Sequence, residues 1–289
     1  MESTYFPLER LPECLQHLTD APRGLNVAGD PDALEGSAVA IVGSRRASKN
    51  GRELAHHLGR ELAAAGLVVV SGLAHGIDGA SHRGALAVKG RTVAVLGSGL
   101  GHIYPKAHVS LARDIVRGGG ALVSEYAEND TPRKHHFPQR NRLISGLALG
   151  VIVVEATTRS GSLITARLAA SQGREVMAVP GPVTSPLARG CHRLLKEGAA
   201  LIEDEDDVLY ALGLPPVAKA NAGDTAKALA GALAEMLVVI GTEPMSLQQI
   251  LRLTGLSASV ATSRIVELEL LGFVEGHRGG YIRRPFSDG

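Results

Sequence analysis

The stretch VAIVGSRRASKNGRELAHHLGRELAAAGLVVVS, residues 39–71, decides the fold class of this chain. Two apolar runs, residues 39–42 and 67–71, flank a segment, residues 50–65, in which leucine recurs at helical spacing. Continuous apolar runs of this kind are typical of strands that are buried on both faces of a parallel sheet. A strand, a helix and a second strand in this order indicate an α/β protein.

The same alternation continues over residues 36–205 and predicts a doubly wound, mostly parallel α/β sheet. The expected strands are Val39–Val42, Leu67–Ser71, Thr92–Leu96, Ala121–Val123, Val151–Val154 and Glu175–Val179. The expected helices are Asn50–Ala65, Asp78–Val88, Ala107–Arg117 and Leu163–Ser171, with a further helical run that starts near Arg140.

Small residues follow many of these expected strands. In an open parallel sheet, ligands bind beyond the carboxyl ends of the strands. A single glycine there can simply turn the chain, but five such loops crowd one edge of the sheet and favour a binding site. The loops begin with Gly43-Ser44-Arg45, Ser71-Gly72, Gly97-Ser98-Gly99, Glu155-Ala156 and Pro180-Gly181.

Basic residues are concentrated in one segment, residues 131–174. It carries seven Lys and Arg residues and one acid, Glu155, although the whole chain has 30 Lys and Arg residues against 29 Asp and Glu residues. A cationic segment with an aromatic, Phe137, and many small hydrogen-bonding residues suits a polyanion that carries flat rings. Single-stranded nucleic acid has both properties. Within the segment, residues 134–142 and 159–165 are expected to form the site.

Arg45 and Phe137 have the clearest individual rationale. The two small residues before Arg45 let backbone N–H groups face an anion, while the guanidinium can fork onto a phosphate. An interdomain salt bridge is the alternative role for Arg45. Phe137 is surrounded by basic residues and histidines in RKHHFPQR rather than by apolar residues, so it is expected to stack on a base.

Polar residues on both sides of strand 151–154 complete the expected site. Positive charges at a helix start oppose the helix dipole, so Arg140 and Arg142 are not placed there for helix stability. After the strand, hydroxyl and N–H groups ahead of a helix are suited to hold an anion. The residues concerned are Arg140, Asn141 and Arg142 before the strand, and Ser160, Gly161, Ser162 and Thr165 after it.

Known catalytic and cofactor motifs are absent from the sequence, so no catalytic residue, cofactor or metal site is expected. The glycine-rich run 97–101 departs from the dinucleotide fingerprint, because His102 stands at its sixth position. No phosphate-binding Gly-Lys pair, Gly-x-Ser-x-Gly elbow or His-Glu-x-x-His zinc motif occurs. His75, Asp78 and His82 are expected to be structural, with Asp78 capping the helix that follows.

Composition places the chain among ordinary globular proteins, with 45% hydrophobic and 20% charged residues. Two cysteines make no disulfide framework and fit a reducing cytosol. The N-terminus lacks the apolar segment of a signal peptide, and no apolar run reaches the length of a membrane span. The chain is therefore expected to be cytoplasmic.

The chain is expected to divide into four segments. Residues 1–35 form a short extension without a clear fold, 36–213 the α/β domain, 214–225 a Pro-, Ala- and Gly-rich linker, and 226–289 a second domain. Three helices followed by a small hairpin describe a winged helix. The helices are Ala226–Ile240, Leu247–Thr254 and Ala258–Leu271, and the hairpin pairs Phe273–Glu275 with Tyr281–Arg284.

Several long blocks resemble the DNA processing protein A family, also called DprA or Smf. They cover roughly residues 36–200, and the winged helix resembles the C-terminal domain of many members. The blocks are AIVGSR, SGLAHGIDGASHRGAL, GSGLGHIYP, SEYAENDTPRKHHFPQRNRLIS, VVEATTRSGSLITARLA, GREVMAVPG and GCHRLLKEGA. Here His192 stands where the family pattern has Asn, and only about 35 residues precede the sheet, so the N-terminal helical domain of many members is absent or reduced.

The resemblance implies a Rossmann-like domain that binds single-stranded DNA and forms a homodimer. It also implies loading of RecA onto incoming strands in natural transformation, protection of those strands, and help to RecA in displacing single-strand-binding protein. The family has no established catalytic activity. By motif position, the DNA-contacting residues are Arg45, Lys134 and Phe137, and Arg140, Asn141, Arg142 and the Ser-Gly-Ser turn share their pocket.

Two alternatives remain open from the sequence. One is a nucleotide-processing phosphoribohydrolase on a related fold, although EATTRSGSLITA replaces its PGGxGTxxE pattern. The other is a transcription regulator acting through the winged helix, whose third helix carries Arg264 against Glu267 and Glu269 and is therefore too acidic for duplex reading.

Overall fold

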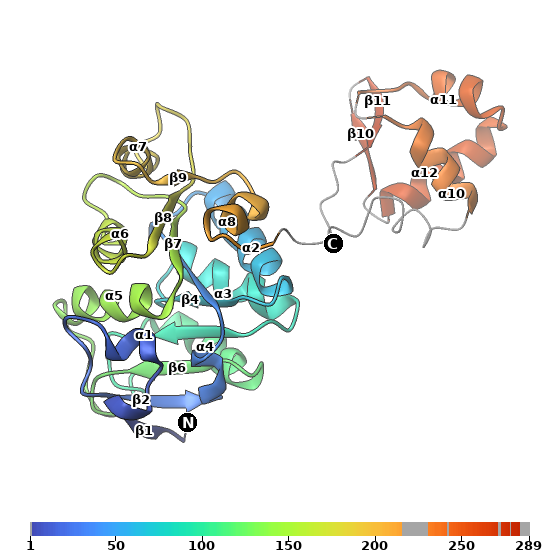
Figure 1. Cartoon of the computed structure of the whole chain (residues 1–289). Helices are drawn as coiled ribbons and strands as arrows, with labels where there is room; N and C mark the ends of the chain where they lie inside the picture. Colours follow the sequence, from blue (N-terminus) through green and yellow to red (C-terminus); the bar gives the residue numbers. More distant parts are fainter. Residues whose placement is uncertain (1, 216–230, 242, 271–272, 278, 284–289) are drawn as a thin grey trace. The chain divides into compact units, whose positions relative to one another are not determined.

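The structure is a computed structural model, and it describes residues 2–215, 231–241, 243–270, 273–277 and 279–283 (Figure 1). The chain forms two compact units, Met1–Val217 and Ala218–Gly289. Residues 1–35 belong to the first unit together with the α/β domain. Most of the expected linker, and the start of the helix expected at Ala226, lie outside the described residues.

A nine-stranded sheet forms the centre of the first unit. Seven neighbouring strands run parallel, and at one edge β2 pairs antiparallel with β6 and β1 pairs antiparallel with β2. Across the sheet the order is β1 (Thr4–Pro7), β2 (Gly24–Gly29), β6 (Ala121–Ser124), β5 (Thr92–Val95), β4 (Val68–Ser71), β3 (Ala38–Val42), β7 (Gly150–Val153), β8 (Glu175–Ala178) and β9 (Ala200–Leu201).

Helices cover both faces of this sheet (Figure 1). Side chains alternate along a strand. In β3, Ala40 and Val42 therefore pack into one core, and Val39 and Ile41 into the other. One face carries α1 (Glu13–Gln16), α5 (His136–Leu147), α6 (Ser162–Ser171) and α7 (Arg189–Lys196), and the other carries α2 (Lys49–Ala64), α3 (Ile77–Ala87), α4 (Val109–Arg117) and α8 (Glu205–Ala211). Short 3-10 turns lie at Leu8–Arg10, Pro31–Leu34 and Lys106–His108.

The doubly wound architecture predicted from the sequence is confirmed, and each of the six expected strands is found to within one residue at either end. The helical run expected near Arg140 begins earlier, at His136. Pro138 is tolerated there because the first N–H groups of a helix have no partner inside the helix.

The N-terminal segment, expected to be a short extension without a clear fold of its own, is part of the sheet. It contributes β1 and β2, and β2 pairs antiparallel with β6 through Asn26 and Ser124. The Asn26 side chain also donates to the carbonyl of Tyr126, at 2.9 Å. These partners are about a hundred residues away in sequence, so no local pattern marks the strand.

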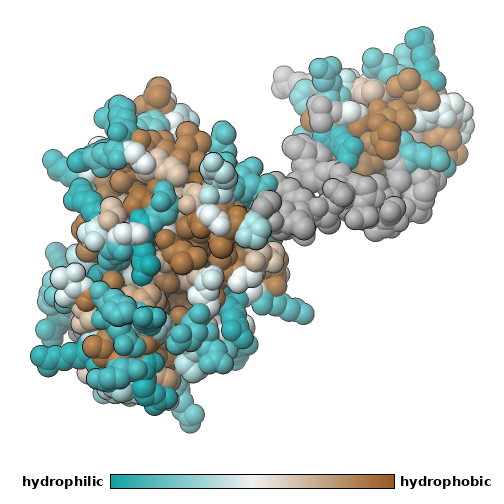
Figure 2. Space-filling view, in the orientation of Figure 1, coloured by the Kyte–Doolittle hydropathy of each residue, from teal (hydrophilic) through white to brown (hydrophobic). Residues whose placement is uncertain are grey.

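The second unit contains the expected winged-helix elements. The helix α11 begins with a capping box between Ser246 and Gln249 and ends at Gly255, whose φ of 66° favours glycine. Figure 2 shows apolar residues on the surface of this unit, and Val238 and Leu253 are among the exposed ones. The elements are α10 (Gly231–Val239), α11 (Leu247–Thr254), α12 (Ala258–Leu270), β10 (Val274–His277) and β11 (Gly280–Arg283).

Candidate nucleic-acid interface

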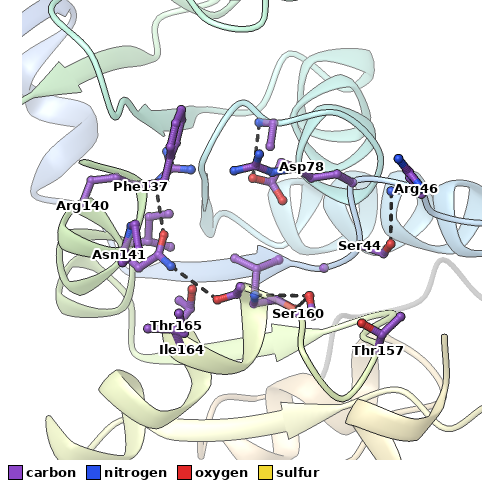
Figure 3. A pocket seen from close by; sticks show the side chains of 18 of the residues that line it. Ser44, Arg46, Asp78, Phe137, Arg140, Asn141, Thr157, Ser160, Ile164 and Thr165 are labelled. Carbon is purple, nitrogen blue, oxygen red and sulfur yellow. Dashed lines mark hydrogen bonds between the residues drawn. The ribbon is translucent and has the colours of Figure 1, made fainter. Parts of the chain in front are cut away.

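A pocket of about 780 Å³ opens at the carboxyl ends of β3 and β7 (Figure 3). The chain leaves β3 toward β4 on one side and later returns to β7 on the other side, so this is the point where the strand order reverses. Such switch points hold ligands in open α/β sheets. The walls come from the loop after β3, from α3, from the loop after β5, from α5 and from the turn before α6.

One face of α5 forms a wall of the pocket. Phe137, Arg140, Asn141 and Ile144 all line it, and their spacing of three, four and seven residues places them on one side of a helix. The helix therefore presents an aromatic ring, a guanidinium and an amide to the same space.

Arg142 does not share this pocket, which corrects the prediction that it would. Two residues along a helix correspond to about 200°, so Arg142 lies on the opposite side of α5 from Arg140. Its guanidinium is nearly buried and pairs with Glu125 at 2.7 Å and with Asp20 at 3.1 Å. Arg142 therefore ties α5 to the N-terminal segment and to the loop after β6.

Arg140 lines the pocket, but it has little exposed surface. Its side chain is only 4% exposed, and its guanidinium donates to the carbonyl oxygens of Gly72, at 2.9 Å, and Val95, while Nε donates to Asn141 at 3.1 Å. Burial lowers the pKa of Arg140 to about 10, against the opposing attraction of Asp78, so it stays cationic at neutral pH. Arg140 therefore forms a positively charged floor of the pocket and links α5 to the ends of β4 and β5.

Asp78 is not the helix cap that the sequence suggested. Gly76, with a φ of 77°, occupies the cap position of α3, and Asp78 is the second residue of its first turn. Its carboxylate accepts from the backbone N–H groups of Gly72, at 3.2 Å, and Ala74, at 3.3 Å. Burial raises the pKa of this carboxyl, while Arg140 opposes the rise. Asp78 thus holds the loop after β4.

His82 is structural, as the sequence predicts. The Thr92 hydroxyl donates to the Val69 carbonyl at 2.6 Å, so the hydrogen bond of 2.7 Å between Thr92 and Nδ1 of His82 requires a proton on Nδ1. Nε2 is buried and has no hydrogen-bond partner among the described residues. Burial lowers the pKa of His82 to about 3, and the ring is neutral.

Arg45 and Phe137 meet at the mouth of the pocket. The Arg45 guanidinium carbon lies 5.0 Å from the centre of the Phe137 ring, a cation–π distance. Arg45 is exposed, as are Arg46 beside it and Lys134 one turn before Phe137. Three exposed cations and an aromatic ring therefore share one opening.

The turn before α6 supplies polar groups on the opposite wall. The Ser160 and Ser162 hydroxyls are 2.7 Å apart, and Asn141 donates weakly to the carbonyl of Gly161 at 3.5 Å. The N–H groups of Ser162, Leu163 and Ile164 bond within the turn, so the hydroxyls and the positive end of the helix dipole are what favour an anion here. Thr165, one turn into α6, also lines the pocket.

Three of the predicted glycines, Gly72, Gly97 and Gly99, support the site from behind and do not line the pocket. A Cβ at Gly72 would overlap the Arg140 guanidinium, and one at Gly97 would lie 2.9 Å from the Phe137 ring. A Cβ at Gly99 would overlap the Ala127 carbonyl oxygen. Their role is to let α5 and a neighbouring loop approach closely.

Ten of the predicted residues line the pocket together, and four do not. Residues that the sequence reasoning missed at this site include Arg46 and Tyr104, of which Tyr104 could have been noticed as an aromatic in a loop of a chain with few aromatics. The ten are Ser44, Arg45, Lys134, Phe137, Arg140, Asn141, Ser160, Gly161, Ser162 and Thr165, and the four are Gly72, Gly97, Gly99 and Arg142.

Neither a metal site nor a membrane-spanning helix is found among the described residues. No group of three or more His, Cys, Asp or Glu side chains in the described ranges is arranged to hold a metal ion. None of the helices described is long and apolar enough to cross a lipid bilayer.

Two family models match this sequence. The model for DNA recombination-mediator protein A covers residues 4–213, and the model for the DprA winged helix domain covers residues 215–280. The chain belongs to the DNA recombination-mediator protein A family. The resemblance that the motif blocks indicated is therefore confirmed, and the match includes the N-terminal strands that the blocks did not reach.

Curated relatives cover most of the chain. Protein Smf of Escherichia coli is 41% identical over 281 residues, which are 95% of this chain and 75% of the relative. DNA processing protein DprA of Streptococcus pneumoniae is 47% identical over 195 residues, which are 68% of each chain.

Solved structures agree with this assignment. DNA processing protein A from Streptococcus pneumoniae is 44% identical, with a TM-score of 0.69 over 73% of this chain and 74% of its own. DNA processing protein A from Helicobacter pylori, studied for its single-stranded DNA binding mode, is 32% identical, with a TM-score of 0.66 over 72% of this chain and 95% of its own.

Proposed function

We propose that the pocket between β3 and β7 binds single-stranded DNA. The observation that carries the proposal is the combination of three exposed cations, Arg45, Arg46 and Lys134, with aromatic rings at one opening. The cations would neutralise phosphate groups, and the exposed rings would stack on unpaired bases. A duplex hides its bases in the stack, so the rings would contribute little to duplex binding.

Phosphate groups would bind at two places around the opening. Arg45 and Lys134 hold one phosphate from the loop after β3 and from the segment before α5. The hydroxyls of Ser160 and Ser162, at the positive end of the α6 dipole, donate to a second phosphate. Arg140, whose donors are largely engaged by carbonyl oxygens, contributes positive potential below them.

The comparison with the Helicobacter pylori protein supports this proposal. That protein is described by its single-stranded DNA binding mode. The match covers 95% of the Helicobacter pylori chain and 72% of this chain. Family membership supports a wider role in DNA processing. On this basis we extend the proposal to recombination during natural transformation, in the cytoplasm.

RecA is the partner that this role requires. We propose that a homodimer of this protein holds a strand in two pockets, protects it and presents it to RecA in competition with single-strand-binding protein. The test is RecA filament assembly on a strand coated with single-strand-binding protein, with wild type and Arg45→Ala. Equal assembly with and without the wild-type protein would exclude RecA loading.

The pocket has few acidic groups that could act in catalysis, which favours a binding function. Among the described residues that line it, Asp78 is the only carboxylate, and it is held by two backbone N–H groups. A phosphoribohydrolase needs a carboxylate that can reach the sugar of its substrate. Incubation with nucleoside monophosphates tests this alternative, because released base would establish hydrolysis.

The proposed DNA binding is tested by affinity for a labelled oligothymidine and for a duplex of equal length. We expect tighter binding of the single strand, and a loss of affinity in Arg45→Ala. Arg117→Ala is the matched control, because Arg117 is also exposed but lies on α4, outside the pocket. Equal affinity of wild type and Arg45→Ala would refute the proposal.

A further inference from the structure

Tyr104 is an aromatic residue at the pocket to which no role has yet been given. It lies in the loop after β5, lines the pocket, and is 46% exposed. This loop also contains the glycine-rich run 97–101, whose sequence does not fit a dinucleotide motif. Tyr5 and Tyr210 are also exposed, but Tyr104 is the one that lies beside Phe137 at the pocket.

Phe137 is partly covered before any ligand binds. The Arg45 guanidinium lies over its ring at 5.0 Å, and the Gly97 backbone packs against it closely enough that an added Cβ would lie 2.9 Å away. Tyr104 packs against the same ring with a centre-to-centre distance of 5.7 Å and an interplanar angle of 53°. Phe137 thus supports Arg45 and Tyr104, and Tyr104 retains more open ring surface.

Hydrogen bonds hold the loop that carries Tyr104. Gly99 and Gly101 donate to the carbonyl oxygens of Asp130 and Glu128, both at 2.9 Å. The Ser98 hydroxyl donates to the carbonyl of His102 at 2.7 Å, closing the loop just before Tyr104. A side chain on such a loop loses little conformational freedom on binding, which favours affinity.

The Ser98 carbonyl is also held from β6. The Ser124 hydroxyl donates to it at 2.7 Å, which fixes the loop to the sheet. The glycines are needed for this approach, because a Cβ at Gly99 would overlap the Ala127 carbonyl oxygen. The glycine-rich run therefore serves to position a ring and not to cradle a dinucleotide phosphate.

We propose that Tyr104 is a stacking platform for a base of the bound single strand, placed beside the Phe137–Arg45 pair. The inference rests on the proposed function of the pocket and adds the contact that recognises the base. Because every base has a flat face, the contact tolerates any sequence. Arg45 and Lys134 bind the phosphates that flank the stacked base.

The test compares Tyr104→Ala with Tyr104→Phe on two probes. One probe is an oligothymidine, and the other is an abasic oligomer with the same number of phosphates. Tyr104→Ala is expected to weaken oligothymidine binding about 5- to 150-fold, which corresponds to ~1–3 kcal/mol, and to leave the abasic affinity and the salt dependence unchanged. Tyr104→Phe keeps the ring and is expected to bind as wild type does.

A third variant gives a direct readout of stacking. The chain contains no tryptophan, so Tyr104→Trp introduces a single indole. Its fluorescence is expected to be quenched by oligothymidine and not by the abasic probe. Quenching of the Tyr104→Trp fluorescence does not depend on a change of affinity. It therefore tests the stacking role even if Tyr104→Ala does not fold.

The outcomes separate this inference from the proposed function. If wild type binds oligothymidine no better than a duplex of equal length, the proposed function fails. If wild type prefers the single strand but Tyr104→Ala matches it, or loses both probes equally, the stacking role of Tyr104 is refuted. An unquenched indole in a variant that still binds oligothymidine also refutes it.

Discussion

Replacing Arg45 with alanine removes an exposed guanidinium from the pocket mouth and leaves the fold intact. Arg45 is outside both cores, and its contact in the pocket is with the Phe137 ring at 5.0 Å. The logarithm of the binding constant falls linearly with the logarithm of the salt concentration, and we call the steepness of this fall the salt slope. Each phosphate contact that is lost lowers the salt slope of single-strand binding by ~0.7. Between about 50 mM and about 200 mM salt, the lost contact therefore changes the affinity ratio of wild type to variant by about 2.6-fold.

The assay is fluorescence anisotropy of a labelled oligothymidine at several salt concentrations. We expect Arg45→Ala to bind more weakly at every salt concentration, with the largest deficit at low salt. Arg117→Ala removes the same charge from α4 and is expected to keep the wild-type slope. If the two variants have equal slopes, Arg45 contacts no phosphate and the reasoning is wrong.

Four further predictions concern the pocket and its support. Lys134→Ala should weaken single-strand binding and lower the salt slope by ~0.7, as filter binding at two salt concentrations would show. Phe137→Ala should weaken binding by ~1–3 kcal/mol with little change of slope, measured by anisotropy. Gly72→Ala should lower the free energy of unfolding in urea by about 1–3 kcal/mol, because the new methyl overlaps the Arg140 guanidinium. Burial lowers the pKa of His82 to about 3, so the free energy of unfolding should fall as pH drops below ~6.5, by up to ~1.4 kcal/mol per pH unit.

Each of these predictions has a contrary outcome. An unchanged slope for Lys134→Ala would remove Lys134 from the phosphate contacts, and a slope for Phe137→Ala that falls by as much as that of Lys134→Ala would argue against stacking. Wild-type stability in Gly72→Ala would mean that Arg140 can move without cost. For His82, the comparison is with His82→Gln, which should lose the share of the acid sensitivity that His82 contributes, while His56, His108 and His136, whose pKa values burial also lowers, keep theirs. Equal pH dependence of the two proteins would contradict the assignment.

The parallel part of the fold could be predicted because its signals are local. Strands such as Val39–Val42 are continuous apolar runs, and each is followed by a helix with a regular apolar spacing. The edge strands β1 and β2 escaped prediction for the opposite reason. They are short, β1 ends in Pro7 and β2 begins and ends in glycine, and β2 gains its partner only from β6, far along the chain.

The site was predicted by residue type, and the error at Arg142 concerns the helix that carries it. With α5 starting near Arg140, the cluster of Arg140, Asn141 and Arg142 reads as one patch. Because α5 starts at His136, Phe137 and Ile144 define the face of the helix that lines the pocket. Arg140 and Asn141 lie on this face, and Arg142 does not. Helix phase, and not charge, decides which side chains meet.

Other features depend on approach distances that a sequence does not encode. Gly72 packs against Arg140 and Gly97 against Phe137, and neither contact between residues so far apart in the sequence leaves a local pattern. Tyr104 likewise gained a role from its distance to Phe137.

The central claim is that a single strand lies in the pocket between β3 and β7, and photo-crosslinking tests it most directly. An oligothymidine carrying 5-iodouracil would be irradiated with the wild-type protein, and the crosslinked peptides identified by mass spectrometry. We predict crosslinks at the aromatic residues of the pocket, Tyr104 and Phe137. Crosslinks confined to the winged-helix unit, or to surfaces away from this pocket, would contradict the account.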